Sequence, residues 1–177
     1  ELPTSRLESI LNTLKSTILI TDDKNMELAK KIMDSGKILL FEELKQESIN
    51  QNQLDIIRKQ SLDVDPLYAN FTSGSTGTPK GVLVSHRSVI DFINIFTKEF
   101  NINGKDIIAN QAPFDFDVSV KDIYSTICTG ATLLIIPKKL FSKPAELLDY
   151  ICDNKATTLI WAVSALCLIT TFHALDY

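Results

Sequence analysis

The most informative segment of the sequence is YANFTSGSTGTPKG, at residues 68–81, which lies between two apolar, strand-like runs. Its glycines at 74, 77 and 81 permit positive φ and let backbone N–H groups approach an anion without a Cβ in the way. Hydroxyl side chains add donors, and Lys80 adds a positive charge. The segment therefore predicts a loop that binds phosphate groups. The residues expected to contact the phosphates are Thr72, Ser73, Gly74, Ser75, Thr76, Gly77 and Lys80.

Two other interpretations fit this segment less well. One is a flexible glycine–serine linker, but a linker does not usually lie between two apolar strands. The other is a Walker A loop, which needs Gly-x4-Gly-Lys-Ser/Thr. Here Gly74 and Gly77 are too close together, and Gly81 follows Lys80 where the hydroxyl residue should stand.

Short apolar strands alternate with helical stripes on both sides of the loop. The strands are expected at residues 17–20, 38–41, 66–71, 82–84, 107–109, 132–136 and 158–161. Helices are expected after a capping box formed by Ser5 and Glu8, at residues 26–33, 89–100, 120–127 and 144–152, and from 164 onward. The polar stretch 42–65 fits a surface helix, a loop or a linker. This order predicts an α/β fold, with a three-layer, doubly wound and mainly parallel sheet.

Charge and cysteine content narrow the classes of function. The 18 basic and 22 acidic residues give a net charge of −4, so no strong basic field exists to attract nucleic acid or an anionic membrane. The longest mostly apolar run, residues 159–169, is shorter than the roughly 20 residues of a membrane span. The cysteines at 128, 152 and 167 form no CxxC pair, which argues against a disulfide framework or a metal site and indicates a reducing, cytoplasmic compartment.

The glycine-rich segment resembles a known signature. Residues 72–82, TSGSTGTPKGV, followed by His86, closely resemble the phosphate loop of the adenylate-forming superfamily. That superfamily holds acyl- and aryl-CoA ligases, luciferases and the amino-acid adenylation domains of nonribosomal peptide synthetases. The head of the chain, with Leu2, Pro3 and Arg6 and then residues 18–21, is similar to the core motif and strand that precede the loop in this superfamily.

The resemblance also implies a place for the chain within a larger enzyme. The chain is expected to be an internal segment of the large N-terminal domain of an adenylate-forming enzyme. Residues 1–65 would form the end of a first α/β subdomain with a polar connector. Residues 66–177 would form the phosphate loop and a second α/β subdomain with part of the acceptor pocket.

The segment FDFDVSVKD, at residues 114–122, indicates a branch of the superfamily. It resembles the Phe-Asp-x-Ser motif of amino-acid adenylation domains and, together with residues 129–133, D-alanine–carrier-protein ligase. The resemblance implies that Asp117 binds the α-ammonium group of an amino acid, a donor group that pairs well with a carboxylate. As an alternative, Asp117 caps the following helix, a task that Ser119 could also perform. Asp115 is expected to be a solvated loop residue.

Three further residues are expected to line the pocket for the substrate side chain. Lys121 stands four residues after Asp117, on the same helix face, and in the amino-acid-activating relatives this position lines the pocket. Lys121 could then bind an acidic side chain such as Glu; otherwise it is solvated or pairs with Asp117. The resemblance also assigns Val118 and Trp161 to the pocket wall, although core packing would equally explain the tryptophan. No proton-transfer role is assigned to His86.

The resemblance implies a reaction in two halves. The carboxylate of an amino acid attacks the α-phosphorus of ATP, bound with Mg2+, to give an aminoacyl-adenylate and pyrophosphate. The phosphopantetheine thiol of a peptidyl or acyl carrier protein then takes the aminoacyl group. The adenine, ribose and catalytic-lysine motifs of the superfamily do not occur in this chain, so the segment alone is expected to hold no catalytic residue and to be inactive. A segment of an acyl-CoA or aryl-acid ligase and a non-catalytic nucleotide-binding module are the alternatives.

Overall fold

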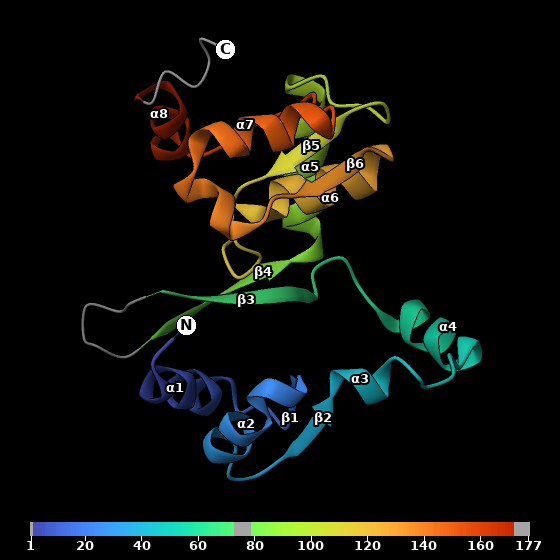
Figure 1. Ribbon diagram of the computed structural model, residues 1–177. Helices are drawn as coiled ribbons and strands as arrows, with labels where there is room; N and C mark the ends of the chain where they lie inside the picture. The colour runs from blue at the N-terminus through green and yellow to red at the C-terminus, as the bar shows by residue number, and fades with distance from the viewer. Residues whose placement is uncertain (1, 73–78, 172–177) are drawn as a thin grey trace. The chain divides into compact units, whose positions relative to one another are not determined.

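The computed structural model describes residues 2–72 and 79–171. Helices and strands alternate along them, as the sequence predicts, and the chain divides into two compact units, residues 1–85 and 86–177 (Figure 1). The boundary between the units comes after residue 85, at the end of the strand that follows the glycine-rich segment. The predicted boundary was after residue 65, before this segment. The reason is that this strand, β4 (Lys80–Ser85), packs against the first helix, α1 (Thr4–Leu14), of the first unit.

The first unit is built on a parallel pair of strands. Strand β1 runs beside β2 with Ile18 opposite Lys37 and Thr21 opposite Leu40. Helices α1 and α2 pack against each other, and α2 buries Ala29 and contacts both strands. The elements of this unit are α1, β1 (Ile18–Thr21), a 3-10 helix (Asp23–Asn25), α2 (Met26–Ile32), β2 (Lys37–Leu40), α3 (Phe41–Leu44), α4 (Gln51–Gln60), β3 (Pro66–Thr72) and β4.

The predicted capping box at the start of α1 is wrong. The helix begins at Thr4, its N-cap is Pro3, and no side chain caps it. The carbonyl of Pro3 accepts hydrogen bonds from the N–H groups of Arg6 and Leu7, at 3.0 and 3.2 Å. Because Pro3 already starts the hydrogen-bond ladder, Ser5 falls inside the first turn, where it cannot act as a cap.

The polar stretch that the sequence left open contains helices α3 and α4. Asn50 caps α4, since its Oδ1 accepts a hydrogen bond of 3.1 Å from the N–H of Gln53. The apolar side chains Leu54, Ile56 and Ile57 are exposed on this helix. The stretch is therefore a capped surface helix with short flanking segments.

Gly36, the turn residue between α2 and β2, is a position where we expect a substitution to be costly. Its φ is +138°, and a Cβ there would lie 2.9 Å from the carbonyl oxygen of Thr17, which accepts a 2.8 Å bond from Lys37 N–H. We expect Gly36→Ala to cost about 1–3 kcal/mol of stability, measured by hydrogen exchange at the amides of β1 and β2.

Gly130 is the matched control for this substitution. It also has positive φ, +73°, but a Cβ there meets nothing within 4 Å. Gly130→Ala should cost only the strain of a left-handed residue, about 1 kcal/mol. Equal losses for the two variants would show that the contact with Thr17 is unimportant.

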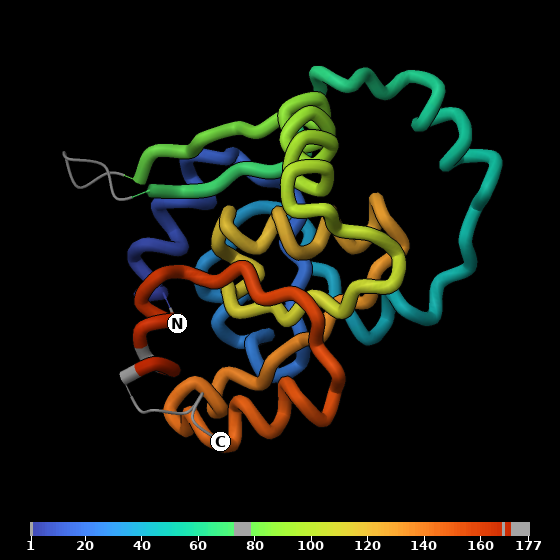
Figure 2. The backbone as a smooth tube through the Cα atoms, turned by 90° about the horizontal axis from the view of Figure 1, so that it is seen from above, coloured from blue at the N-terminus to red at the C-terminus, as the bar shows by residue number. Residues whose placement is uncertain are grey.

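Strands β3 and β4 form an antiparallel hairpin around the glycine-rich segment. They run side by side, with Ala69 opposite Leu83 and Thr72 opposite Lys80 (Figure 2). The predicted strand–loop–strand arrangement is confirmed at both ends. The residues between them, 73–78, lie outside the described residues.

The second unit contains the other parallel pair of strands. Strand β5 runs beside β6 with Ile107 opposite Thr132 and Asn110 opposite Ile135. Gly130 ends helix α6 in the left-handed conformation. The elements of this unit are α5 (His86–Glu99), β5 (Ile107–Asn110), α6 (Ser119–Thr129), β6 (Thr132–Ile135), a 3-10 helix (Lys138–Ser142), α7 (Pro144–Asp153) and α8 (Val163–Thr171).

The core of this unit lies where α7 and α8 meet the two strands. Its buried members are Ala109, Ile136, Leu140, Leu147, Ile151, Trp161, Ala165 and Ile169. The predicted strand at 158–161 is wrong, because only Thr158 forms a bridge, with Ile108. After this bridge the chain leaves the sheet, and the Trp161 indole N–H donates to the carbonyl of Ala109 at 2.8 Å.

Asp106 connects the start of β5 to residues 157–158 and should make stability depend on pH. Its carboxylate accepts hydrogen bonds from Asn103 N–H at 2.8 Å, from the Thr157 hydroxyl at 2.8 Å and from the Thr158 hydroxyl at 3.2 Å. These bonds, the one from Asn103 first, lower the pKa of Asp106 against a smaller opposing effect of burial. Because folding lowers the pKa, the ionised carboxylate stabilises the folded unit at pH values above its ordinary pKa of about 3.9. This stabilisation is lost as the pH falls through the lower pKa of the folded state.

We expect Asp106→Asn to lower the free energy of unfolding at pH 7 by about 1 kcal/mol. The decline in stability below about pH 4 should become shallower. An acid titration followed by circular dichroism measures both effects. The exposed Asp149→Asn variant on α7 is the control and should leave the pH 7 value unchanged. An acid profile of Asp106→Asn that matches the unsubstituted protein would contradict this assignment.

Candidate functional site

The turn end of the β3–β4 hairpin brings two of the predicted phosphate-binding residues together. Thr72 ends β3, Lys80 begins β4, and the two residues are direct partners in the register. Opposite residues of an antiparallel pair present their side chains on the same face, and both residues are exposed. The hairpin therefore holds a hydroxyl and an ammonium group side by side, a donor set that fits an anion. The other predicted members, Ser73, Gly74, Ser75, Thr76 and Gly77, lie outside the described residues.

Gly81 has a different role from the one that its place in the glycine-rich segment suggests. It lies within β4 opposite Phe71, and a Cβ at this position would be 3.1 Å from Cζ of that ring. The aromatic side chain thus covers the glycine across the strand pair. The φ of Gly81 is not positive, so the close approach of the Phe71 ring is the feature of this position that favours a glycine.

The segment between β5 and α6 carries Asp117, the predicted ligand of an ammonium group. Asp117 is exposed in the turn that leads into α6, and its carbonyl accepts a 3.0 Å hydrogen bond from Val120 N–H. The N-cap of α6 is Val118, and no side chain caps the helix. The alternative that Asp117 is a helix cap is therefore wrong. Its carboxylate makes no hydrogen bond or ion pair with any residue that the structure describes.

Ser119 makes the hydrogen bonds that close the turn before α6. Its hydroxyl donates to the carbonyl of Phe116 at 2.7 Å, and its N–H donates to the same carbonyl at 3.0 Å. These bonds close the turn without the carboxylate of Asp117, which leaves that group facing solvent. Asp115 is also exposed, as predicted. Of the two carboxylates, only Asp117 stands directly before the helix.

Lys121 is neither solvated nor paired with Asp117, so both alternatives to a pocket role are wrong. Its side chain is only 12% exposed, and its Nζ lies 2.6 Å from Oδ1 of Asp122. Oδ2 of Asp122 accepts a 2.9 Å hydrogen bond from Nδ2 of Asn110, the last residue of β5. A buried carboxylate thus joins the lysine to the carboxyl end of a strand, the edge where α/β sheets usually bind ligands.

The buried face of α6 is polar, which the sequence pattern did not predict. The helix at 120–127 was predicted from an apolar stripe of Val120, Ile123, Tyr124 and Ile127. The first three of these side chains are half-buried, but Ile127 is 70% exposed. The residues of α6 that are buried are Ser119, Asp122 and Ser125, three residues apart. The signal that could have found them is this regular polar spacing after a strand that ends in Asn110.

The remaining predicted pocket residues occupy different surroundings. Val118 is exposed at the start of α6, next to Asp117. Trp161 is buried in the core, where its ring meets that of Phe141 edge-on at a centroid distance of 5.5 Å. Core packing and the hydrogen bond to Ala109 explain this tryptophan fully, and a wall position in the substrate pocket remains a prediction. His86 begins α5 and is half-buried.

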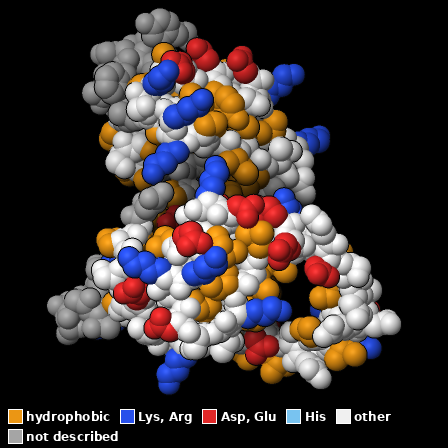
Figure 3. Space-filling view, turned by 60° about the horizontal axis from the view of Figure 1, so that its bottom comes forward, with side chains coloured by type: hydrophobic (Ala, Val, Ile, Leu, Met, Phe, Trp, Pro, Cys, Tyr) orange, Lys and Arg blue, Asp and Glu red, His pale blue; other side chains and the backbone are white. Residues whose placement is uncertain are grey.

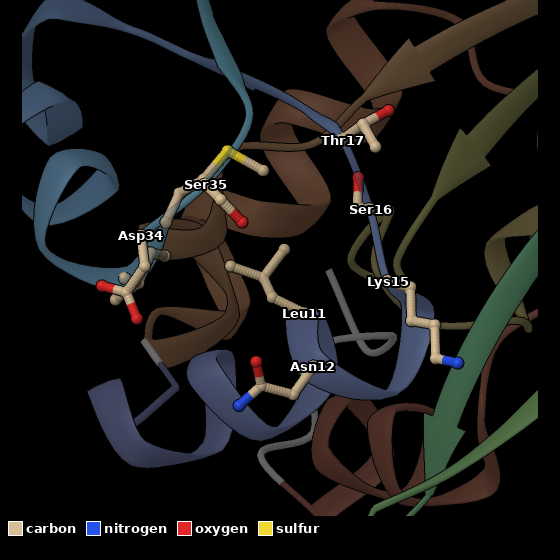
Figure 4. A pocket seen from close by; sticks show the side chains of 9 residues that line it. Leu11, Asn12, Lys15, Ser16, Thr17, Asp34 and Ser35 are labelled. Atoms are coloured by element: carbon tan, nitrogen blue, oxygen red, sulfur yellow. The ribbon is translucent and has the colours of Figure 1, made fainter.

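The first unit also contains a shallow pocket of about 330 Å³. Figure 4 shows Lys15, Ser16 and Thr17 on one side of it, Asp34 and Ser35 on the other, and Leu11 between them. None of the residues predicted to bind phosphate or substrate lines this pocket. We therefore assign this pocket no part in binding phosphate or substrate.

Three observations concern other classes of function. On the face shown in Figure 3, Lys and Arg side chains alternate with Asp and Glu side chains. Over residues 2–72 and 79–171, no helix is long and apolar enough to cross a membrane. Within the same residues, no three His, Cys, Asp or Glu side chains lie close enough together to hold a metal ion.

Comparison with known proteins assigns the family. The protein family described as AMP-binding enzyme matches residues 1–175. The chain belongs to the AMP-binding enzyme family. The predicted membership of the adenylate-forming superfamily is thereby confirmed.

Three curated relatives resemble the chain, one over about half of its length and two over most of it. D-alanine--D-alanyl carrier protein ligase of Bacillus cytotoxicus is 42% identical over 85 residues, 48% of this chain and 17% of that protein. Gramicidin S synthase 1 of Brevibacillus brevis is 29% identical over 159 residues, 90% of this chain and 14% of that protein. Tyrocidine synthase 1 of Brevibacillus parabrevis is 26% identical over the same share. The matched regions thus span 14–17% of the length of these relatives.

Solved structures show the same fold. The Vibrio cholerae adenylation domain AlmE, solved with glycyl-adenosine-5'-phosphate, matches 96% of this chain and 36% of its own, with a TM-score of 0.76 and 22% identity. The nonribosomal peptide synthetase FmoA3 matches 95% of this chain and 17% of its own, with a TM-score of 0.72 and 22% identity. These matches, together with the parallel strand pairs, confirm the predicted α/β fold.

Proposed function

We propose that the full-length protein that carries this chain is an amino-acid-activating, AMP-forming ligase. It uses ATP to convert an amino acid to its aminoacyl-adenylate with release of pyrophosphate. It then passes the aminoacyl group to the phosphopantetheine thiol of a carrier protein. The observation that carries the proposal is the exposed carboxylate of Asp117, which has no partner among the described residues and lies in the segment between β5 and α6.

The amino acid would be oriented by its ammonium group. Three N–H donors of an ammonium match a carboxylate, and the ion pair strengthens once bound substrate displaces water from it. An acid without an amino group has no use for Asp117. The name of one relative, D-alanine--D-alanyl carrier protein ligase, agrees with an amino-acid substrate.

The nucleotide would be held through its phosphates by the hairpin. Lys80 supplies a positive charge and Thr72 a hydroxyl at the place where the β- and γ-phosphates would lie, and the residues between them would complete the cradle. Such a site accelerates the reaction by positioning the phosphates and by neutralising their charge as pyrophosphate leaves. Mg2+ would arrive with ATP, and we assign no ligand for it among the described residues.

The chain would supply this site and part of the pocket, but not a complete enzyme. Because the chain matches only a small share of its relatives, we propose that the 177 residues alone are inactive. We place the full-length activity in the cytoplasm, where ATP is abundant and free cysteines such as the exposed Cys128, Cys152 and Cys167 stay reduced.

ATP–pyrophosphate exchange by the full-length protein tests the proposal. Each amino acid, D-alanine included, is compared with its deaminated analogue at equal concentration. We expect exchange with one or a few amino acids and none above background with their analogues. Equal exchange with a deaminated acid would instead indicate an acyl-CoA or aryl-acid ligase, and no exchange with any acid would indicate a non-catalytic nucleotide-binding module.

A further inference from the structure

The buried ion pair on α6 has a consequence for substrate choice. We infer that Asp122 is a positioning residue that holds the ammonium group of Lys121 and balances its charge. The inference rests on the proposed function and on the predicted position of Lys121 beside the side chain of the amino acid. Through Lys121, Asp122 then determines whether the pocket favours an acidic or an uncharged substrate side chain.

Both oxygens of the Asp122 carboxylate are engaged. One accepts a hydrogen bond from Lys121 at 2.6 Å and the other from Asn110 at 2.9 Å, and the side chain is only 2% exposed. Asn110 is itself buried at the end of β5. The carboxylate is therefore fixed from two sides, and it fixes the lysine in turn, since a buried charge needs a partner.

Lys121 retains donors after this pairing. An ammonium group has three N–H donors, and one of them points to Asp122. The others can reach a substrate side chain, but the net charge of the Lys121–Asp122 pair is zero. The negative charge of Asp122, close behind Lys121, would repel a substrate carboxylate. It would not repel an uncharged amide. The pair should therefore favour an uncharged polar side chain, and Lys121 freed from Asp122 should favour an acidic one.

The test compares each acid with its isosteric amide in the full-length protein. The readout is the ratio of kcat/KM for Glu over Gln, and for Asp over Asn, in ATP–pyrophosphate exchange. We expect Asp122→Asn to raise this ratio about 10-fold or more, for Glu over Gln or for Asp over Asn, whichever acid and amide fit the pocket. In the Lys121→Met background the same substitution should change the ratio less than about threefold, because the freed ammonium group is then absent.

Ser125→Ala is the matched control. Ser125 is buried on the same face of α6, one turn beyond Asp122, and its hydroxyl has no hydrogen-bond partner among the described residues. This variant perturbs the packing of the helix without touching Lys121, so its ratio should equal that of the unsubstituted protein. A general disturbance of α6 would move the ratio in both variants.

Thermal unfolding provides a second readout that does not depend on activity. Lys121→Met should lower Tm because it leaves Asp122 buried without its partner, and adding Asp122→Asn should recover most of that loss. If the decreases in Tm caused by Lys121→Met and Asp122→Asn simply add in the double variant, the pairing of the two residues is overturned. A ratio for Asp122→Asn within twofold of the unsubstituted protein, or no measurable exchange with either acid, would overturn the role in substrate choice. An unsubstituted protein that accepts deaminated acids would overturn the proposed function itself.

Discussion

Asp117→Ala should lower kcat/KM for amino-acid-dependent ATP–pyrophosphate exchange by about 100-fold or more. Removing one partner of a desolvated, hydrogen-bonded charge pair costs about 2–5 kcal/mol, and each 1.36 kcal/mol corresponds to a factor of ten. The carboxylate has no partner among the described residues and caps no helix, so its removal should leave the fold unchanged. The loss would then belong to substrate binding alone, with Tm unaltered.

Asp115→Ala is the control for this prediction. Asp115 is an exposed carboxylate two residues away on the same segment, and its removal changes the net charge by the same amount. We expect its kcat/KM to stay within about twofold of the unsubstituted protein, as for other exposed charges. Similar losses in both variants would mean that the segment acts through its overall charge. An Asp117→Ala variant with full activity would overturn the assignment of Asp117.

Leu147→Ala should be the most destabilising of the core substitutions. Leu147, on α7, is fully buried within the core of the second unit. Truncation of a buried leucine removes apolar contacts and leaves a cavity, at a cost of about 2–5 kcal/mol. Hydrogen exchange at the amides of α7 and β6 measures this loss locally.

Leu166→Ala on α8 is the control for the core substitution. Leu166 is 41% exposed although its neighbour Ala165 belongs to the core. Its truncation should cost less than half as much, because solvent already covers part of the side chain and little cavity forms. Equal losses at the two positions would show that Leu147 lies in a region that collapses easily.

The order of helices and strands could be predicted because it depends on short-range patterns. The apolar runs that became β1, β5 and β6, and the stripes that became α2, α5 and α7, each show their period within a few residues. Errors arose where a distant partner overrode the pattern. The run at 158–161 looks like a strand, but the Trp161 indole reaches back to Ala109 and takes the chain out of the sheet.

The candidate site, too, could be predicted only in part. The phosphate segment and Asp117 could be found from residue types and from a resemblance that extends over neighbouring residues. The exposure of Asp117 could not, because it depends on Ser119 closing the turn in its place. Asp122 was missed altogether, since an acidic residue within a helix usually faces solvent.

The sequence by itself determined the α/β order, the anion-binding character of residues 72–80 and the family signature, because each is written in residues that are neighbours along the chain. The tertiary structure decided which face of α6 is buried and which carboxylate Lys121 pairs with. Those outcomes depend on Asn110, twelve residues before Asp122, whose amide makes a charged side chain tolerable inside the unit. Burial of a charge is settled by the partners that folding brings to it, and the spacing of polar residues along α6 does not by itself identify Asn110 as that partner.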